Sequence, residues 1–428
     1  MKLCCLYFLL PVLFIPAISF AQKEPTKVVA GIPVNYNEDS VGTYTLPNPL
    51  LCKDGESIVS SSAWLMKRRP EIVSLYDEYQ LGKMPGSPAD MHFKVFDKGT
   101  ITLNGKAIRK QITIYFTKDS LHKMDLLVYL PANATKPVPL LLHISFTANC
   151  NTIKDDSTIA ASYIWTKDGK KVLAQKGEDY KFKFGIEPFI DAGFGVATVY
   201  YGDIEPDFKE GIQYGIRSVY LKQGQTQPAA NEWGAISAWA WGLSRAMDYF
   251  ETDKQVDAKR IALFGVSRLG KTVLWTGAHD TRFAMVIANC SGEGGASLSR
   301  RNYGETIKML ASPTRYAYQF CHNYQLYGDS VNKLPVDGHM LISLMAPRPL
   351  LLETGDVDYW SDPKGEFLAA IAATPVYHLF GKHGIETATM PASGQPILNT
   401  LGYSMHNGGH GTVPTDWTFA LDFMKKYL

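Results

Sequence analysis

Runs of apolar residues divide this chain into regularly spaced segments. Several runs are continuous stretches of Val, Ile and Leu, which is typical of strands buried on both faces of a sheet. The pattern predicts strands over residues 125–130, 139–146, 195–201, 260–266, 283–289, 350–354 and 376–380.

Apolar residues at helical spacing lie between these strands. The spacing predicts helices over 233–250 and 367–373, and a last helix that follows Thr415 and Asp416 and continues through Leu428. Strands that alternate with helices imply a mostly parallel sheet covered by helices on both faces. The expected fold is therefore α/β, a three-layer sandwich.

The organisation along the chain favours one large domain over 61–428. Residues 22–60 are polar and punctuated by Pro and Gly, so we expect them to wrap around that domain. The stretch 149–189 is rich in loop-forming residues and has no clear period, which suggests an insertion over one face.

The first 21 residues have the pattern of a signal peptide. Lys2 precedes an apolar run over 6–20, and small residues at Ser19 and Ala21 suit cleavage before Gln22. We therefore expect a secreted or periplasmic protein. No later apolar run approaches the length of a membrane span. Four cysteines remain after cleavage and would be compatible with one or two disulfides: Cys52, Cys150, Cys290 and Cys321.

Composition narrows the function classes. Hydrophobic residues make up 46% of the chain and charged residues 20%, as in a globular enzyme with a substantial core. The net charge of +2 argues against a nucleic-acid partner, which would require a clustered basic excess. Aromatic residues, at 12%, suit a carbohydrate-facing surface but are equally well explained by core packing.

The segment 260–271 carries the most specific chemistry. An apolar strand pattern stops at Gly265, presents Ser267, and resumes as a helical pattern through His279. A strand, a sharp turn and a helix form the nucleophile elbow of α/β-hydrolases, where helix amides can bind an oxyanion. Leu269 occupies the usual second glycine position, and the glycine follows one residue later at Gly270. A serine in an ordinary loop is the alternative.

A serine nucleophile needs a base and an acid, which follow it in the order acid, then histidine, in this fold. His410 lies in a glycine-rich loop just before the terminal helix, and His406 is the near alternative. Asp358 follows an apolar strand in a turn, where a triad acid is expected, and Asp356 is the alternative acid. Ordinary loop positions remain an alternative for all four residues.

Several separated blocks resemble the landmarks of glucuronoyl esterases of carbohydrate esterase family 15. The resemblance covers residues 60–428. It implies an α/β-hydrolase that cleaves esters between 4-O-methyl-glucuronic acid on xylan and lignin alcohols, with no cofactor and no metal. The blocks that carry it are Gly265–Lys271, Cys290–Ala296, Arg300–Thr306, Leu334–His339, Ala346–Pro349, Asp358–Phe367 and Gly409–His410.

The resemblance also assigns roles. Ser267 matches the family nucleophile, His410 the base, and Arg268 an arginine that helps to stabilise the oxyanion. The residues implied to bind the glucuronoyl ring are Lys271, Glu305 and Trp360, and the matching block adds His339 to the expected substrate-binding set. Without the resemblance, surface charge would explain Lys271 and Glu305, and core packing would explain Trp360.

Two departures from the family pattern bear on the site. Many members place the triad glutamate where this chain has Cys290, so the acid must come from elsewhere. Other bacterial members use an acid after the later strand, and that pattern selects Asp358. Relatives also tend to carry a glycine-rich stretch where this chain has 146–150, which suggests an altered pocket or a bridge between Cys150 and Cys290.

The expected protein is an exported serine esterase that acts on glucuronoxylan esters, without a cofactor and as a monomer. One alternative is a deacetylase of xylan or another carbohydrate on the same scaffold. A second alternative is a carbohydrate-binding protein whose triad has decayed, because position 290 lacks a carboxylate.

Overall fold

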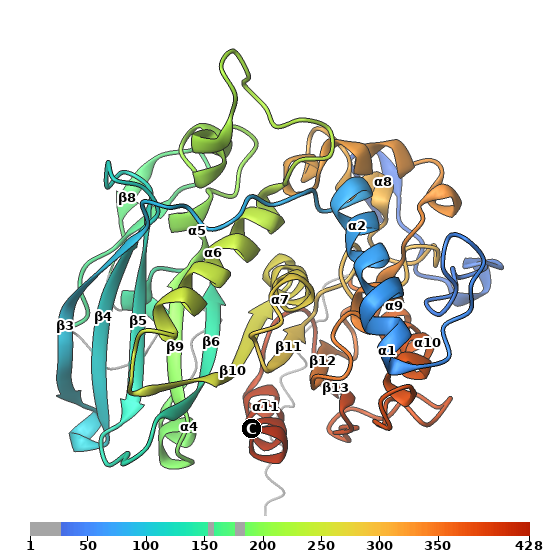
Figure 1. Ribbon diagram of the computed structural model, residues 1–428. Helices are drawn as coiled ribbons and strands as arrows, with labels where there is room; N and C mark the ends of the chain where they lie inside the picture. Colours follow the sequence, from blue (N-terminus) through green and yellow to red (C-terminus); the bar gives the residue numbers. More distant parts are fainter. Residues whose placement is uncertain (1–26, 153–157, 176–184) are drawn as a thin grey trace, which may run out of the picture.

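The computed structural model describes residues 27–152, 158–175 and 185–428 (Figure 1). The expected signal peptide lies outside the described residues. Its removal, and the export that it implies, therefore remain predictions.

A nine-stranded sheet forms the centre of the molecule, in the order β13-β12-β11-β10-β6-β9-β5-β4-β3. Strands β9, β6, β10, β11, β12 and β13 are mutually parallel, and β5, β4 and β3 continue the sheet in antiparallel fashion. The strands are β3 (His92–Thr102), β4 (Ala107–Tyr115), β5 (Lys123–Pro131), β6 (Val138–Ser145), β9 (Gly195–Tyr200), β10 (Val256–Val266), β11 (Met285–Asn289), β12 (Leu350–Gly355) and β13 (Leu401–His406).

Six of the seven strands expected from the sequence are present as β5, β6, β9, β10, β11 and β12. The strand predicted over 376–380 is wrong, because these residues form the last turn of helix α10 (Pro363–His378) and the turn that follows it. Val376 and Tyr377 are fully buried there. A short apolar run does not distinguish a strand from a buried helical turn. Helix α10 also continues past Pro375, a residue that seldom lies inside a helix.

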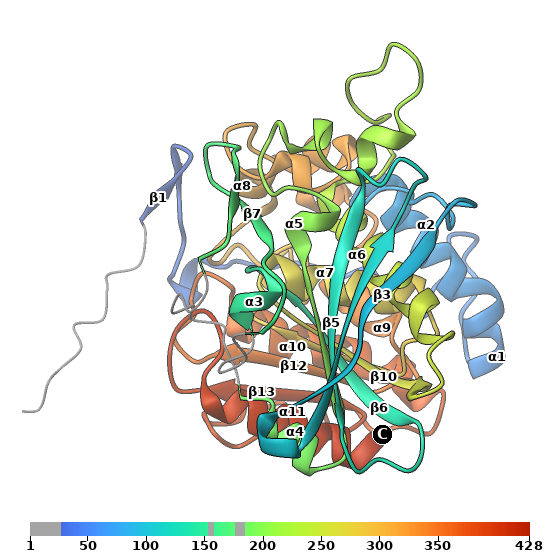
Figure 2. The ribbon, with the colours of Figure 1, turned by 90° about the vertical axis from the view of Figure 1, so that its left-hand side faces the viewer.

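Helices cover both faces of the sheet, as expected (Figures 1 and 2). One hydrophobic cluster packs the sheet against α6 (Ala235–Phe250), α7 (Arg268–His279), α9 (Gly338–Ser343) and α10. The other packs it against α4 (Glu187–Asp191) and α11 (Pro414–Tyr427). Neighbouring residues of β6 alternate between the clusters, since Leu140 and Leu142 belong to the first and Leu141 to the second. This alternation is the pleat of a strand buried on both faces.

The N-terminal part of the described chain contacts the loop that follows β11. Asn35 donates from Nδ2 to the carbonyl of Asn302 at 2.6 Å, and the amide of Gly304 donates to the carbonyl of Asn35 at 2.9 Å. Further on, the carbonyl of Pro47 lies 2.8 Å from Nε2 of His339. The stretch 149–189, where described, contains a short helix, α3 (Asn149–Thr152), and the hairpin β7 (Tyr163–Trp165) and β8 (Lys171–Leu173).

The predicted Cys150–Cys290 bridge is not formed, because Cys290 is a free, buried thiol. Cys52 and Cys321 are also free thiols. Hydrophobic packing and hydrogen bonds, rather than these cysteines, therefore hold the described fold together.

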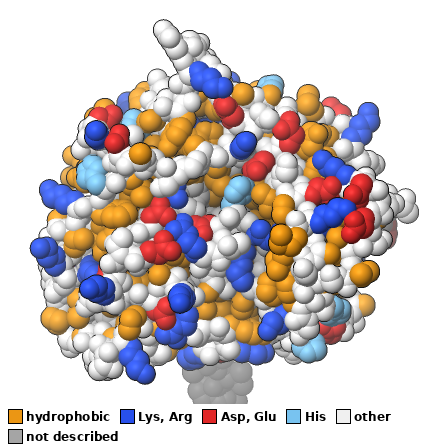
Figure 3. Space-filling view, in the orientation of Figure 1, with side chains coloured by type: hydrophobic (Ala, Val, Ile, Leu, Met, Phe, Trp, Pro, Cys, Tyr) orange, Lys and Arg blue, Asp and Glu red, His pale blue; other side chains and the backbone are white. Residues whose placement is uncertain are grey.

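The surface carries charges of both signs. On the face shown in Figure 3, basic and acidic side chains are interspersed, in keeping with the net charge of +2. Among the described residues, we find no helix that is both long and apolar enough to cross a membrane.

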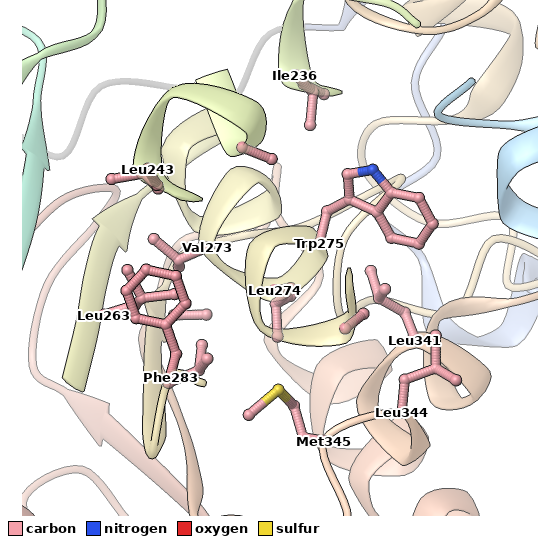
Figure 4. Packing of buried hydrophobic residues seen from close by; sticks show 14 of the residues in the cluster. Ile236, Leu243, Leu263, Val273, Leu274, Trp275, Phe283, Leu341, Leu344 and Met345 are labelled. Atoms are coloured by element: carbon pink, nitrogen blue, oxygen red, sulfur yellow. The ribbon is translucent and has the colours of Figure 1, made fainter. Parts of the chain in front are cut away.

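Helix α7 lies at the centre of the larger cluster (Figure 4). Its residues Leu274 and Trp275 are fully buried, as are Leu341 and Met345 on the neighbouring segment. Burying a leucine side chain contributes about 1.5–3 kcal/mol. This packing fixes the position of the N-terminal end of α7, where Ser267 lies.

We expect Leu274→Ala to lower the free energy of unfolding by about 2–5 kcal/mol, because the cavity left in this packed core collapses only in part. Denaturant titration measures the change. Leu326→Ala serves as the control, because Leu326 is 67% exposed and its loss should change stability by less than about 0.5 kcal/mol. Equal losses in both variants would contradict the central role of α7.

Candidate active site

Ser267 occupies a sharp turn between β10 and α7. Its backbone has φ 60° and ψ −127°, a conformation that non-glycine residues rarely adopt. The Ser267 amide donates to the carbonyl of Asn289 at 2.8 Å, and the amide of Lys271 donates to the carbonyl of Ser267 at 3.1 Å. The turn is thus tied both to β11 and to its own helix, which has the geometry of a nucleophile elbow.

The glycines of the elbow allow this close packing. A Cβ on Gly265 would lie 2.3 Å from the Leu269 carbonyl oxygen, and one on Gly270 would lie 2.9 Å from the Asn289 carbonyl oxygen. The helix therefore approaches β11 at Gly270. This close contact is a physical reason for a glycine at position 270, one residue later than the second glycine of G-x-S-x-G.

His410 and Asp358 form a hydrogen-bonded pair beside the elbow. Nδ1 of His410 lies 2.8 Å from Oδ2 of Asp358 and 3.2 Å from the hydroxyl of Ser361. Asp358 is 3% exposed. Burial acts to raise its pKa, but the hydrogen bond and the electrostatic interaction with His410 outweigh burial and lower the pKa. Asp358 is therefore an ionised carboxylate that faces an imidazole.

The alternative base and acids have other partners. Buried His406 bonds through Nδ1 to Asp416 at 3.1 Å and through Nε2 to the carbonyl of Gly409 at 2.9 Å, so neither ring nitrogen is available. Asp356 accepts hydrogen bonds from Ser393 and from the amide of Gly408. These contacts shape the loop that carries His410.

Glu353 is fully buried in β12. Burial and the nearby Asp416 raise the pKa of its carboxyl group, which Asn289 contacts at 3.4 Å. Of Asp356, Asp358 and Glu353, the three carboxylates at the end of β12, Asp358 alone bonds to His410.

Cys290 lies against the Asp358–His410 pair. Its Sγ, a carboxylate oxygen of Asp358 and a ring nitrogen of His410 all lie within 4.8 Å of one another. The three groups are possible metal ligands. However, tetrahedral zinc with ligand bonds of about 2.0–2.2 Å separates its ligand atoms by roughly 3.3 Å or more. The 2.8 Å separation of His410 and Asp358 fits a hydrogen bond better than a shared ion.

A cavity of about 190 Å³ opens in front of these groups. The cavity brings together all but two of the residues that the sequence selected for the site. The expected residues that line it are Ser267, Arg268, Lys271, Glu305, Trp360 and His410. Asp358 lies behind His410 and contacts it directly.

His339 is the expected substrate-binding residue that does not lie in the cavity. It is fully buried, with its Nε2 bonded to the carbonyl of Pro47. The motif that contains it therefore contributes to the packing of the N-terminal segment.

Lys271 and Glu305 are buried charged groups in the wall of the cavity, at 6% and 8% exposure. Burial lowers the pKa of Lys271, and the Glu305 carboxylate opposes that shift. Burial likewise raises the pKa of Glu305, against the opposing effect of Lys271 and Arg315. The amide of Glu305 donates to the carbonyl of Trp360 at 3.0 Å, which joins two of the expected sugar-binding residues.

Arg268 is held by an ion pair with Asp207. Asp207 also accepts hydrogen bonds from the hydroxyl of Tyr318 at 2.7 Å and from Gln319 at 2.8 Å. Burial alone would lower the pKa of Arg268, but Asp207 and neighbouring tyrosines raise it, so the guanidinium stays charged. The group is therefore a fixed cation one residue from Ser267.

Four residues that shape this site were not predicted from the sequence: Asp207, Arg315, Tyr316 and Ser361. Ser361 lies within a block that had already been selected, so its neighbours were a usable signal. Arg315 lies in a turn over 312–315 with no motif around it. Only the folded chain brings it to the cavity.

Comparisons with known proteins agree with this geometry. A family model described as glucuronyl esterase, fungi, matches residues 225–381. Carbohydrate esterase MZ0003, from an unknown prokaryotic organism, is 44% identical over 402 residues, which cover 92% of each chain. The chain belongs to carbohydrate esterase family 15, the glucuronoyl esterases.

Solved structures of this family have the same fold. The glucuronoyl esterase from Solibacter usitatus has a TM-score of 0.86 and 45% identity, over 91% of this chain and 99% of that one. A promiscuous CE15 esterase from the marine bacterial metagenome has a TM-score of 0.82 and 43% identity, over 92% of this chain and 100% of that one. These likenesses confirm the α/β-hydrolase fold and the expected enzyme class, a carboxylic ester hydrolase.

Proposed function

We propose that this protein is an exported glucuronoyl esterase that hydrolyses the ester between (4-O-methyl-)D-glucuronic acid of glucuronoxylan and lignin alcohols. One observation carries the proposal. The cavity that contains Ser267 and His410 also contains Lys271, Glu305 and Trp360. An ammonium group and a carboxylate can bind sugar hydroxyls, and an indole can pack on a sugar face, so ester chemistry and uronate recognition share one site.

In the proposed mechanism, Ser267 Oγ attacks the C6 carbonyl of the esterified glucuronate. His410 accepts the serine proton at Nε2, because Nδ1 is engaged by Asp358 at 2.8 Å. The His410–Asp358 pair stabilises the imidazolium that forms. His410 then returns the proton to the departing alcohol, and an acyl-enzyme is left on Ser267.

The tetrahedral intermediate places a negative charge on the former carbonyl oxygen. The N-terminal amides of α7 and the Arg268 guanidinium are the proposed donors to that oxygen. Because Asp207 and two aromatic rings hold the guanidinium, it needs little reorganisation when the charge develops. Water, activated by His410, then attacks the acyl-enzyme and releases the uronic acid.

A deacetylase of xylan or another carbohydrate is the second candidate function. The solved structure of a promiscuous relative motivates it. A small acetyl ester would need the serine, histidine and aspartate but not Lys271 or Glu305. The other alternative, a binding protein with a decayed triad, is disfavoured by the intact hydrogen bond between His410 and Asp358.

The deciding experiment measures hydrolysis of methyl glucuronate and of an aryl acetate, with Ser267→Ala as the control. A glucuronoyl esterase should prefer the glucuronate ester and lose both activities in Ser267→Ala. Preference for the acetate would support the deacetylase. Binding of glucuronoxylan without any serine-dependent turnover would support the binding protein.

The acid has its own test. If Asp358 orients His410, Asp358→Asn should lower kcat on the order of 10⁴-fold, the loss known for the corresponding change in a well-studied serine triad, while the melting temperature stays close to that of the wild type. Asp356→Asn is the matched control and should lower kcat far less. Full activity in Asp358→Asn would refute the assignment.

Lys271 tests recognition of the sugar. Losing a charged hydrogen bond should cost about 1.5–3 kcal/mol, so we expect Lys271→Ala to lower kcat/KM for methyl glucuronate by about one to two decades. An aryl acetate has no hydroxyls to hold, so its kcat/KM should barely change. Equal losses on both substrates would mean that Lys271 supports the elbow instead.

The pH dependence of KM follows from the burial of Lys271. Its pKa lies below the ordinary lysine value of 10.5, so its charge is complete at low pH and is lost as pH rises through the lowered pKa. KM for methyl glucuronate should therefore rise in alkaline solution, and the rise should begin at a lower pH than that at which a surface lysine loses its charge. In Lys271→Met the KM should be high at every pH, and an unchanged alkaline rise would assign the effect to another group.

A further inference from the structure

A row of alternating rings and guanidinium groups runs through the wall of the cavity. The guanidinium carbon of Arg268 lies 6.0 Å from the ring centroid of Phe146 and 4.7 Å from that of Tyr316. The guanidinium carbon of Arg315 lies 4.7 Å from the same Tyr316 ring and 5.3 Å from the ring of Trp360. These distances are within the range of cation–π attraction. The row therefore joins the arginine beside Ser267 to the tryptophan expected to contact the sugar.

Arg315 contacts two of the three expected sugar-binding residues. Besides stacking on Trp360, its Nη1 lies 3.2 Å from Oε1 of Glu305. The side chain is 18% exposed and lines the cavity. A lysine at this position would be a point charge without a flat face, whereas a guanidinium can stack on a ring and pair with a carboxylate at once.

The hydrogen-bonding capacity of Arg315 is not filled within the protein. Within the described part of the chain, its buried Nη1 has no acceptor in hydrogen-bond geometry, although the ion pair with Glu305 is close. Buried polar groups normally have a partner, and a missing one calls for an explanation. Nη1 faces Glu305, so a ligand oxygen in the cavity that Arg315 lines would meet the part of the guanidinium that Glu305 does not occupy.

We infer that Arg315 is a further substrate-binding residue, which holds Trp360 and Glu305 against the uronate ring and donates a hydrogen bond to one of its oxygens. This inference rests on the proposed function, because the ligand is the sugar of the glucuronate ester. It assigns to Arg315 a role in specificity for a hydroxylated ring. The acetyl group of an aryl acetate lacks the oxygens that would meet this donor.

The effect on Arg268 should be small. Arg268 keeps its ion pair with Asp207 and its contact with Phe146 when Arg315 is replaced. A loss confined to sugar binding is thus separable from a loss of oxyanion stabilisation, and KM and kcat report on the two effects.

The test compares Arg315→Met, which removes the charge but keeps a long apolar side chain, with Arg315→Lys, which keeps the charge but loses the plane. We expect KM for methyl glucuronate to rise about tenfold to a hundredfold in Arg315→Met, with kcat changed less than threefold and turnover of an aryl acetate unchanged. Arg315→Lys should recover only part of the loss. The control is Lys308→Met, an exposed side chain on the same segment that pairs with Asp329 and should leave both KM values as in the wild type.

Binding measured without turnover completes the test. In a Ser267→Ala background, calorimetric titration with methyl glucuronate should show that Arg315→Met weakens affinity by the same factor as the rise in KM. An unchanged KM and affinity in Arg315→Met, or equal losses on both substrates, would overturn the inference. A wild-type enzyme that turns over only the acetate would instead overturn the proposed function, so the two failures are distinguishable.

Discussion

The strained turn at Ser267 is the constraint on which the site depends. A non-glycine residue at φ 60° costs about 1–3 kcal/mol and persists only when the surrounding structure holds it there. The packing of α7 supplies that support, because Leu274 and Trp275 are fully buried between the sheet and the neighbouring helices. The amide of Ser267 is also tied to β11 through Asn289. The core and the turn that presents Ser267 are therefore parts of one rigid arrangement.

Two further positions near the site have left-handed backbone without being glycine. Cys290 has φ 47° directly after β11, and Asp362 has φ 54° just before α10. The amide of Cys290 donates to the carbonyl of Glu353 at 2.7 Å, and Asp362 accepts from the amide of Gly365 at the start of α10. Strained positions of this kind gather where a chain must aim side chains into a functional site.

The thiol at position 290 has an electrostatic consequence for the acid. A second carboxylate so close to Asp358 would disfavour its ionised form by like-charge repulsion. Burial keeps the pKa of Cys290 well above its ordinary value, so the thiol stays neutral; it donates to the carbonyl of Gly411 at 3.8 Å and places no charge beside Asp358. A thiol at position 290, where many family members have a glutamate, is therefore physically compatible with the proposed use of Asp358 as the triad acid.

The sequence by itself determined six of the buried strands, the elbow at Ser267 and the helices around it, because continuous apolar runs and glycine-bounded turns are local signals. Three strands were not predicted: the two edge strands, β3 and β13, and β4, which lies next to β3. β3 is largely exposed, so few of its positions must be apolar and the alternation of apolar and polar residues along it is weak. The apolar run at 376–380 led to a wrong strand prediction, because a buried helical turn and a strand have the same apolar pattern over five residues.

Only the tertiary structure decided which of several acids and histidines meet. His406 and Asp356 resemble His410 and Asp358 in sequence context. In the folded chain, however, His406 bonds to Asp416 and Gly409. Asp356 bonds to Ser393 and Gly408. Arg315 came to the cavity in the same way, by a contact between segments 45 positions apart in the chain. The physical reason is that hydrogen bonds and ion pairs between distant segments depend on the loop conformations that the packed core imposes, and no local pattern of residue types encodes them.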